Sequence, residues 1–293
     1  VIEPQDLSLI NALMPEVGNF AGPLEARLVV KGTPDHPLLE SGFLRADGVW
    51  KKGGLGARLM VDSEVVNHVL QIGAPDGRPG ITISMERPAK GPAPSANPKQ
   101  NRGKAEAPAA SLGTVRISGS YDPFAGPKSR WGLGKYEIAL KADKLEGDIA
   151  KIISGIATAD LTLRGDPEAQ PMDKISGAVQ IANAKVTIPR KAITGGFSWR
   201  PRFSPQMDIA VIASDMHVET ATAQVILAGK GKIGGHLGYE PMALDMKLGA
   251  KKGKLDFPAA AAEIKTLDVT ASKQPEQPLN ITGRMEAQAR VGR

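Results

Sequence analysis

The sequence contains no cysteine, few aromatic residues and no long hydrophobic run. The lack of cysteine excludes disulfides, thiolate zinc sites and cysteine nucleophiles together. Aromatic residues make up only 4% of the chain, whereas a sealed core normally uses more of them to fill its volume. No stretch approaches the roughly 20 consecutive apolar residues that a membrane-spanning helix needs. Neither a disulfide-stabilised scaffold nor a helical membrane domain fits this sequence.

Motifs for catalysis and for cofactor binding are weak or missing. Gly229–Gly234 satisfies G-x-G-x-x-G, but a dinucleotide site requires a helix after the glycine turn, and the residues up to Pro241 do not favour one. No P-loop lysine motif and no G-x-S-x-G elbow occurs. No histidine has a second one at metal-ligand spacing. The four histidines are His36, His68, His217 and His236. We therefore predict a protein that is not an enzyme and uses no metal or cofactor.

The formal net charge of +6 makes nucleic-acid binding an alternative that has to be weighed. The basic residues are dispersed along the chain, and few aromatic residues are available to stack on bases. We therefore predict no nucleic-acid partner and assign the charge to a solvated outer sheet face. Attraction to anionic lipid surfaces is a minor alternative.

The sequence is rich in turn residues and in alternating apolar positions. Its 33 glycines and 23 prolines favour many short strands separated by turns. From about residue 115 onward, apolar residues alternate with polar ones, which gives each strand one apolar face. This pattern is typical of antiparallel sheets that are solvated on one side. The residues that we predict to line the apolar face are Val179, Ile181, Ile209, Val211, Val225, Leu227, Leu244, Met246, Leu248, Leu255, Phe257, Leu267 and Val269.

Two segments depart from the strand pattern and predict short helices. Asp6 can cap a helix that ends before Pro15, and residues Glu146–Ile156 place four isoleucines at helical spacing. Residues 87–112 are rich in proline, alanine and lysine, and we predict a disordered loop there. We expect the strands on either side of this loop to be joined by it. The predicted organisation is a first β repeat unit over 1–86, this loop, and further repeat units over 113–293.

An internal repeat is visible without a gap. Residues Ala26–Pro34 match Ala159–Pro167, with glycine and proline in register at an offset of 133 residues. A weaker third copy begins at Gly235. Repeats that stack along one direction bury a continuous apolar surface shared between neighbouring units. We therefore expect an elongated β structure that is built from similar hairpin units.

These residues resemble the TamB family, within the wider group of AsmA-like envelope proteins. The resemblance covers most of the chain except the proline-rich loop. It rests on Asp6–Ser8, Gly22–Gly32, Pro37–Leu39 and Gly42–Leu44, and it recurs at Ala159–Gly165 and Pro171–Val179. The resemblance implies an all-β fold whose sheet forms an open, taco-like trough with an apolar interior. It also implies a periplasmic protein anchored in the inner membrane, with an outer-membrane barrel protein as partner.

Because the chain begins at Val1 rather than at methionine, we expect a mature form or an internal or C-terminal-half segment, with membrane contact through terminal regions that are missing. The function that we predict is a conduit carrying phospholipid or another acyl lipid between inner and outer membranes. One alternative is an assembly module that adds a strand to the barrel partner, since an unpaired sheet edge is a template for pairing. An enzyme acting on a lipid or glycan is a third. An ordinary packed β core would show the same alternation as a lipid-lined trough.

Overall fold

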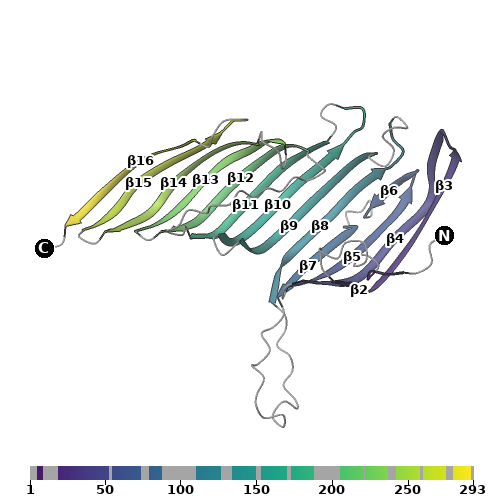
Figure 1. Cartoon of the computed structure of the whole chain (residues 1–293), viewed down its shortest axis with the longest axis horizontal. Helices are drawn as coiled ribbons and strands as arrows, with labels where there is room; N and C mark the ends of the chain where they lie inside the picture. Colours follow the sequence, from purple (N-terminus) through teal and green to yellow (C-terminus); the bar gives the residue numbers. More distant parts are fainter. Residues whose placement is uncertain are drawn as a thin grey trace, which may run out of the picture. The chain divides into compact units, whose positions relative to one another are not determined.

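The computed structural model describes most of the chain as β-strands (Figure 1). The described residues are 5–8, 19–52, 55–73, 79–87, 110–126, 134–149, 153–169, 173–187, 205–220, 222–236, 242–257, 260–274 and 280–291. They contain no helix, so the predicted all-β class is confirmed. The chain divides into two compact units, Val1–Asp122 and Pro123–Arg293. The predicted boundaries at residues 86 and 112 stay a prediction.

Unit 1 is an antiparallel sheet in which β3, β4 and β5 are successive neighbours. β6 and β7 both pair with β5 and with β8, so the two together occupy one position in the sheet. The short strands β1 and β2 pair with β3 and β4. The strands are β1 Gln5–Asp6, β2 Asn19–Ala21, β3 Pro23–Thr33, β4 His36–Lys52, β5 Leu55–Val66, β6 Val69–Ile72, β7 Ile81–Arg87 and β8 Ala110–Asp122.

The two strands predicted beside the proline-rich loop are confirmed as strands, and the structure shows that they pair with each other. Ile81 of β7 lies opposite Ile117 of β8, and Ile83 lies opposite Val115. The loop itself lies at 88–109, outside the described residues. At its predicted ends, Arg87 and the first residues of β8 are already part of strands.

Unit 2 is a sheet in which each strand pairs with the next one along the chain (Figure 1). Every pair is antiparallel except β11 with β12, which is parallel. The prediction of a purely antiparallel sheet is therefore wrong at this pair. Alternation with a period of two does not distinguish the two directions, and the link after β11 is long enough for the crossover that a parallel pair requires. The strands are β9 Lys135–Ile149, β10 Ile153–Gly165, β11 Asp173–Thr187, β12 Gln206–Glu219, β13 Ala223–His236, β14 Met242–Phe257, β15 Ala260–Lys273 and β16 Asn280–Val291.

The predicted helix over Glu146–Ile156 is wrong, because the segment forms the end of the β9–β10 hairpin. Ile149 lies directly opposite Ile153, and Glu146 lies opposite Ile156. Isoleucine favours strands over helices because its branched Cβ packs well on a pleated surface. For the predicted N-terminal helix, Asp6 lies in β1 and Leu7 in a turn. Ser8 lies in the same turn, and residues 9–14 lie outside the described part of the chain.

A line of β-bulges crosses unit 2. Lys144 of β9, Asn183 of β11 and Asp215 of β12 have positive φ angles of 49°, 50° and 50°, and each lies where the strand pairing shifts or is interrupted. Further shifts occur between β13 and β14 and between β15 and β16. Each bulge adds one residue, which exchanges the faces of the residues beyond it and bends the strand. Ala213 and Met216 of β12 are three residues apart, so a regular strand would place them on opposite faces. The bulge between them places both on the same face.

The two copies of the internal repeat form equivalent hairpins, β3–β4 and β10–β11. Leu28 lies opposite Gly42 in one hairpin, and Leu161 lies opposite Gly177 in the other. Gly42 and Gly177 both have positive φ, at 154° and 135°. A Cβ at Gly177 would lie 2.1 Å from the carbonyl oxygen of Asp160, and the corresponding distance at Gly42 is 2.2 Å. The two glycines therefore have the same structural role.

Candidate functional site

One face of unit 2 is apolar in its central rows from β9 to β16, whereas Tyr136, Asp173 and Lys273 are polar residues that the register places on the same face near strand ends. Residues that lie directly opposite each other on neighbouring strands share a face, so the pairing register defines rows across the sheet. One such row consists of Ala142, Ala159, Val179, Val211, Gly231, Met246, Ala271 and Ile281. No residue in this row is polar. We call this side of unit 2 the apolar face.

The predicted lining residues lie on this apolar face. A second row shows this. Ile181 lies opposite Ala213, and Ala213 lies opposite Gly229. Gly229 lies opposite Leu248, which lies opposite Val269. The other predicted positions fall on the same side by the same reasoning, in strands β11 to β15. Phe257 lies in β14 opposite Ala260, but its side chain is outside the described part of the structure. Whether these residues bind lipid stays a prediction.

The opposite side of unit 2 carries the charged residues. Asp208 lies between Lys232 at 2.8 Å and Lys174 at 3.8 Å, so three neighbouring strands are linked by ion pairs. The hydrogen bond from Lys232, together with the charges of both lysines, lowers the pKa of Asp208 below its usual value. These side chains are about half exposed, and ion pairs at such sites stabilise a fold only slightly because water screens the charges. Their value here is that they identify the water-facing side. We call this side the charged face.

Exposure of the apolar face increases toward β16. Val211 in β12 is 5% exposed and Leu227 in β13 is 8% exposed, whereas Met285 and Ile281 in β16 are 49% and 62% exposed. Every substantial contact between described strands of this unit joins sheet neighbours, so no described element forms a second layer over the apolar face. A sheet with one apolar face normally buries it against another layer.

The sequence prediction missed several residues of the apolar face. Met207 and Ile264 are both 5% exposed and Ala184 is 1% exposed. Met216 and Val218 lie on this face beyond the bulge at Asp215. A signal for them does exist in the sequence. The apolar positions in β12 change from odd to even numbers after Ala213, which is what an inserted bulge residue produces.

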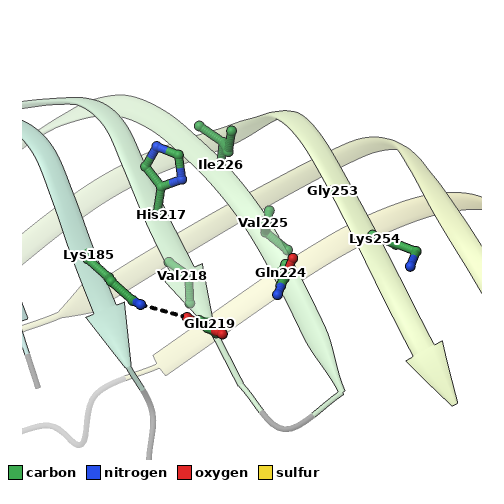
Figure 2. Close-up of a pocket in the computed structure, with 9 residues that line it drawn as sticks. All are labelled: Lys185, His217, Val218, Glu219, Gln224, Val225, Ile226, Gly253 and Lys254. Carbon is green, nitrogen blue, oxygen red and sulfur yellow. Dashed lines mark ion pairs between the residues drawn. The ribbon is translucent and has the colours of Figure 1, made fainter.

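A depression of about 570 Å³ lies over the ends of β11 to β14 (Figure 2). Across it, Lys185 of β11 forms an ion pair with Glu219 of β12 at 3.0 Å. The lining residues are Lys185, His217, Val218, Glu219, Gln224, Val225, Ile226, Gly253 and Lys254. They include no cysteine, serine or threonine, so they do not provide a hydroxyl or thiol nucleophile. Among the described residues no group of His, Cys, Asp and Glu could hold a metal ion.

Among the described residues of unit 2, Tyr136 has the most strongly shifted pKa. Its ring lies against Gly165. The hydroxyl of Tyr136 donates a hydrogen bond of 2.5 Å to Asp173, and a Cβ at Gly165 would lie 2.1 Å from the tyrosine ring. Partial burial, followed by the hydrogen bond and the charge of Asp173, raises the pKa of Tyr136 well above its usual range. The arrangement closes the end of the β10–β11 hairpin, so its role is structural.

No family model, no curated protein and no solved structure matches this chain. The resemblance to the TamB family therefore stays a prediction. Among the described residues, no helix is long and apolar enough to cross a membrane.

Proposed function

We propose that this chain is a non-catalytic lipid conduit, which binds the acyl chains of phospholipids along the apolar face. The observation that carries the proposal is the unbroken apolar row from Ala142 to Ile281, over which no described element forms a second layer. Contiguous apolar surface that stays accessible marks interaction sites in soluble proteins, and most of this row is partly exposed, although Ala142 and Val211 are each only 5% exposed. An acyl chain is the simplest ligand for such a surface, because the row from Ala142 to Ile281 contains no polar side chain that would orient another kind of ligand.

The energetics agree with weak, unspecific binding of acyl chains that move along the apolar face. Burial of apolar surface contributes about 25 cal/mol per Å², so an acyl chain that covers a few hundred Å² gains several kcal/mol. The lining consists mainly of aliphatic side chains and several methionines, among them Met216 and Met246, and methionine adapts to ligands of varied shape. In this proposal the sheet curves into an open trough, and the bulges contribute the bend. The headgroup stays in water while the chains slide along the lining.

The cellular setting belongs to the same proposal. The resemblance to the TamB family supports a periplasmic protein that is anchored to the inner membrane in its full-length form. It also supports transfer between the inner and outer membranes, with an outer-membrane barrel protein as partner. Each unit contains one of the equivalent hairpins β3–β4 and β10–β11, which supply a repeating element for such a protein.

The test is native mass spectrometry of the purified chain, followed by extraction and identification of bound lipid. We expect co-purifying phospholipid that is lost in Leu244→Asp and Met246→Asp, since both residues lie on the apolar face and are only partly buried. Ile212→Asp is the matched control, because Ile212 is 45% exposed and lies on the charged face. A well-folded chain without any lipid, by mass and by circular dichroism, would contradict the proposal.

A second candidate is the assembly module, and one observation favours it. Among the described strands β16 pairs only with β15, and a strand edge without a partner strand is a template for an added strand. The discriminating experiment is binding of a barrel-derived strand peptide in the absence of lipid. Saturable binding with slower exchange of β16 backbone amides would support this candidate.

A further inference from the structure

We propose that Lys273 binds the phosphate of a lipid whose acyl chains lie on the apolar face. This role rests on the proposed function, and it adds which part of the lipid is recognised and where. The strand ends on the side of Lys273 become the headgroup end of the apolar face. The class of ligand is a lipid that carries a negatively charged phosphate next to its acyl chains.

Lys273 differs from the other lysines in both position and burial. It lies at the end of β15, directly opposite Leu244 of β14. Among the directly paired residues of the described strands in unit 2, it is the only basic residue on the apolar face. Every other lysine whose side chain the structure describes is exposed, whereas Lys273 is partly buried. A lysine in this position covers apolar neighbours with its methylene stem and keeps its ammonium at the polar end.

The two ends of the apolar face differ in polarity along the strand direction. At the strand ends on the side of Lys273, the register also places Tyr136 and Asp173 on this face. Toward the opposite strand ends, directly paired residues form a row without a polar member. This row consists of Val218, Val225, Gly253, Ile264 and Ala287. A lipid that lies along the strands therefore meets polar groups at one end only.

A phosphate fits Lys273 in both charge and position. The lysine ammonium is a compact charge with three hydrogen-bond donors, and it binds phosphate as a point charge. Asp173 lies four strands away from Lys273 in the sheet, about 19 Å at the usual strand spacing, so salt largely screens its repulsion. In a glycerophospholipid one glycerol joins the phosphate to the acyl chains. Lys273 and its apolar neighbours Leu244 and Ala271 can therefore bind both parts of one molecule.

The test compares two ligands that have the same acyl chains and differ in the phosphate. The purified, delipidated chain is titrated with fluorescently labelled phosphatidylglycerol and, separately, with equally labelled diacylglycerol. Lys273→Met should raise the dissociation constant for phosphatidylglycerol about three- to tenfold, the range from an exposed ion pair to a charge-assisted hydrogen bond. The dissociation constant for diacylglycerol should not change, because methionine keeps an apolar stem and removes only the charge.

Three further variants make the test specific. Lys273→Gln also removes the charge and should weaken phosphatidylglycerol binding, whereas Lys273→Arg keeps the charge and should bind both lipids like the wild type. Lys247→Met is the matched control, because Lys247 is an exposed lysine of β14 whose side chain lies on the charged face. It should leave both dissociation constants unchanged. An equal loss of phosphatidylglycerol binding in Lys247→Met would overturn the role of Lys273, since the net charge of the protein would then explain the effect.

The outcomes separate the role of Lys273 from lipid binding itself. A wild type that binds neither lipid contradicts the proposed function, and the role of Lys273 falls with it. A wild type that binds both lipids, with phosphatidylglycerol binding unaffected by Lys273→Met and Lys273→Gln, overturns the role of Lys273 and leaves the proposed function standing. Circular dichroism establishes that each variant is folded.

Discussion

Replacing Asn183 tests the bulge line, because the structure predicts an inverted order of stability there. Asn183 lies inside β11 with φ at 50°, a left-handed conformation that costs a residue other than glycine roughly 1–2 kcal/mol. Asparagine tolerates it, whereas a β-branched residue does so poorly. We therefore expect Asn183→Val to be about 1–2 kcal/mol less stable than Asn183→Gly. In an ordinary strand position the order is reversed, since valine is among the best strand formers and glycine among the worst.

The assay is urea unfolding followed by far-UV circular dichroism, with the same two substitutions at Gln180 as the matched control. Gln180 is exposed on the charged face of the same strand and is paired without a bulge on both sides. There, valine should be more stable than glycine by about 1 kcal/mol. If valine is also the more stable substitution at position 183, the left-handed bulge in β11 is wrong, and so is the reasoning that one apolar face continues across it.

Two further predictions concern the hairpins. Gly177→Ala and Gly42→Ala should each lower the free energy of unfolding by about 1–3 kcal/mol, because the added Cβ meets a backbone carbonyl oxygen. Gly147→Ala is the control for the same urea titration. It should be nearly neutral, because a Cβ at Gly147 meets nothing within 4 Å. Tyr136→Phe should cost about 1 kcal/mol at neutral pH through loss of the hydrogen bond to Asp173. Because the folded pKa of Tyr136 is raised, its contribution is fully present below the unfolded value of about 10 and is lost as pH rises above it. The urea midpoint of the wild type should therefore fall more steeply in that alkaline range than that of Tyr136→Phe, and parallel pH profiles would refute the assignment.

The strand class and the apolar face could be predicted because both follow from a period of two. Alternation at Leu244, Met246 and Leu248 places these residues on one side of any strand, whatever its neighbours are. The strands beside the proline-rich loop were predictable for the same reason. The repeat was readable because Ala26–Pro34 and Ala159–Pro167 match without a gap, with glycine and proline in register.

The remaining features depend on partners that a local pattern does not contain. Ile149 and Ile153 have helical spacing, yet the pairing of β9 with β10 places them directly opposite each other. The direction of β12 relative to β11 is set by the path of the link between them, not by the residues of either strand. The bulges left a weak signal in the sequence, because the apolar positions of β12 change from odd to even numbers near Asp215. This change can be interpreted as a bulge once the pairing of the neighbouring strands shows irregularities at the same place.

Position-resolved cross-linking tests the central claim most directly. A photoreactive amino acid is placed in turn at positions 243 to 248 of β14, and the chain is irradiated in the presence of radiolabelled phospholipid. The account predicts lipid adducts at Leu244, Met246 and Leu248, and none above background at Ala243, Asp245 and Lys247, a period of two along the strand. Equal labelling of both faces, or no labelling of either, would contradict the claim that the apolar face binds acyl chains.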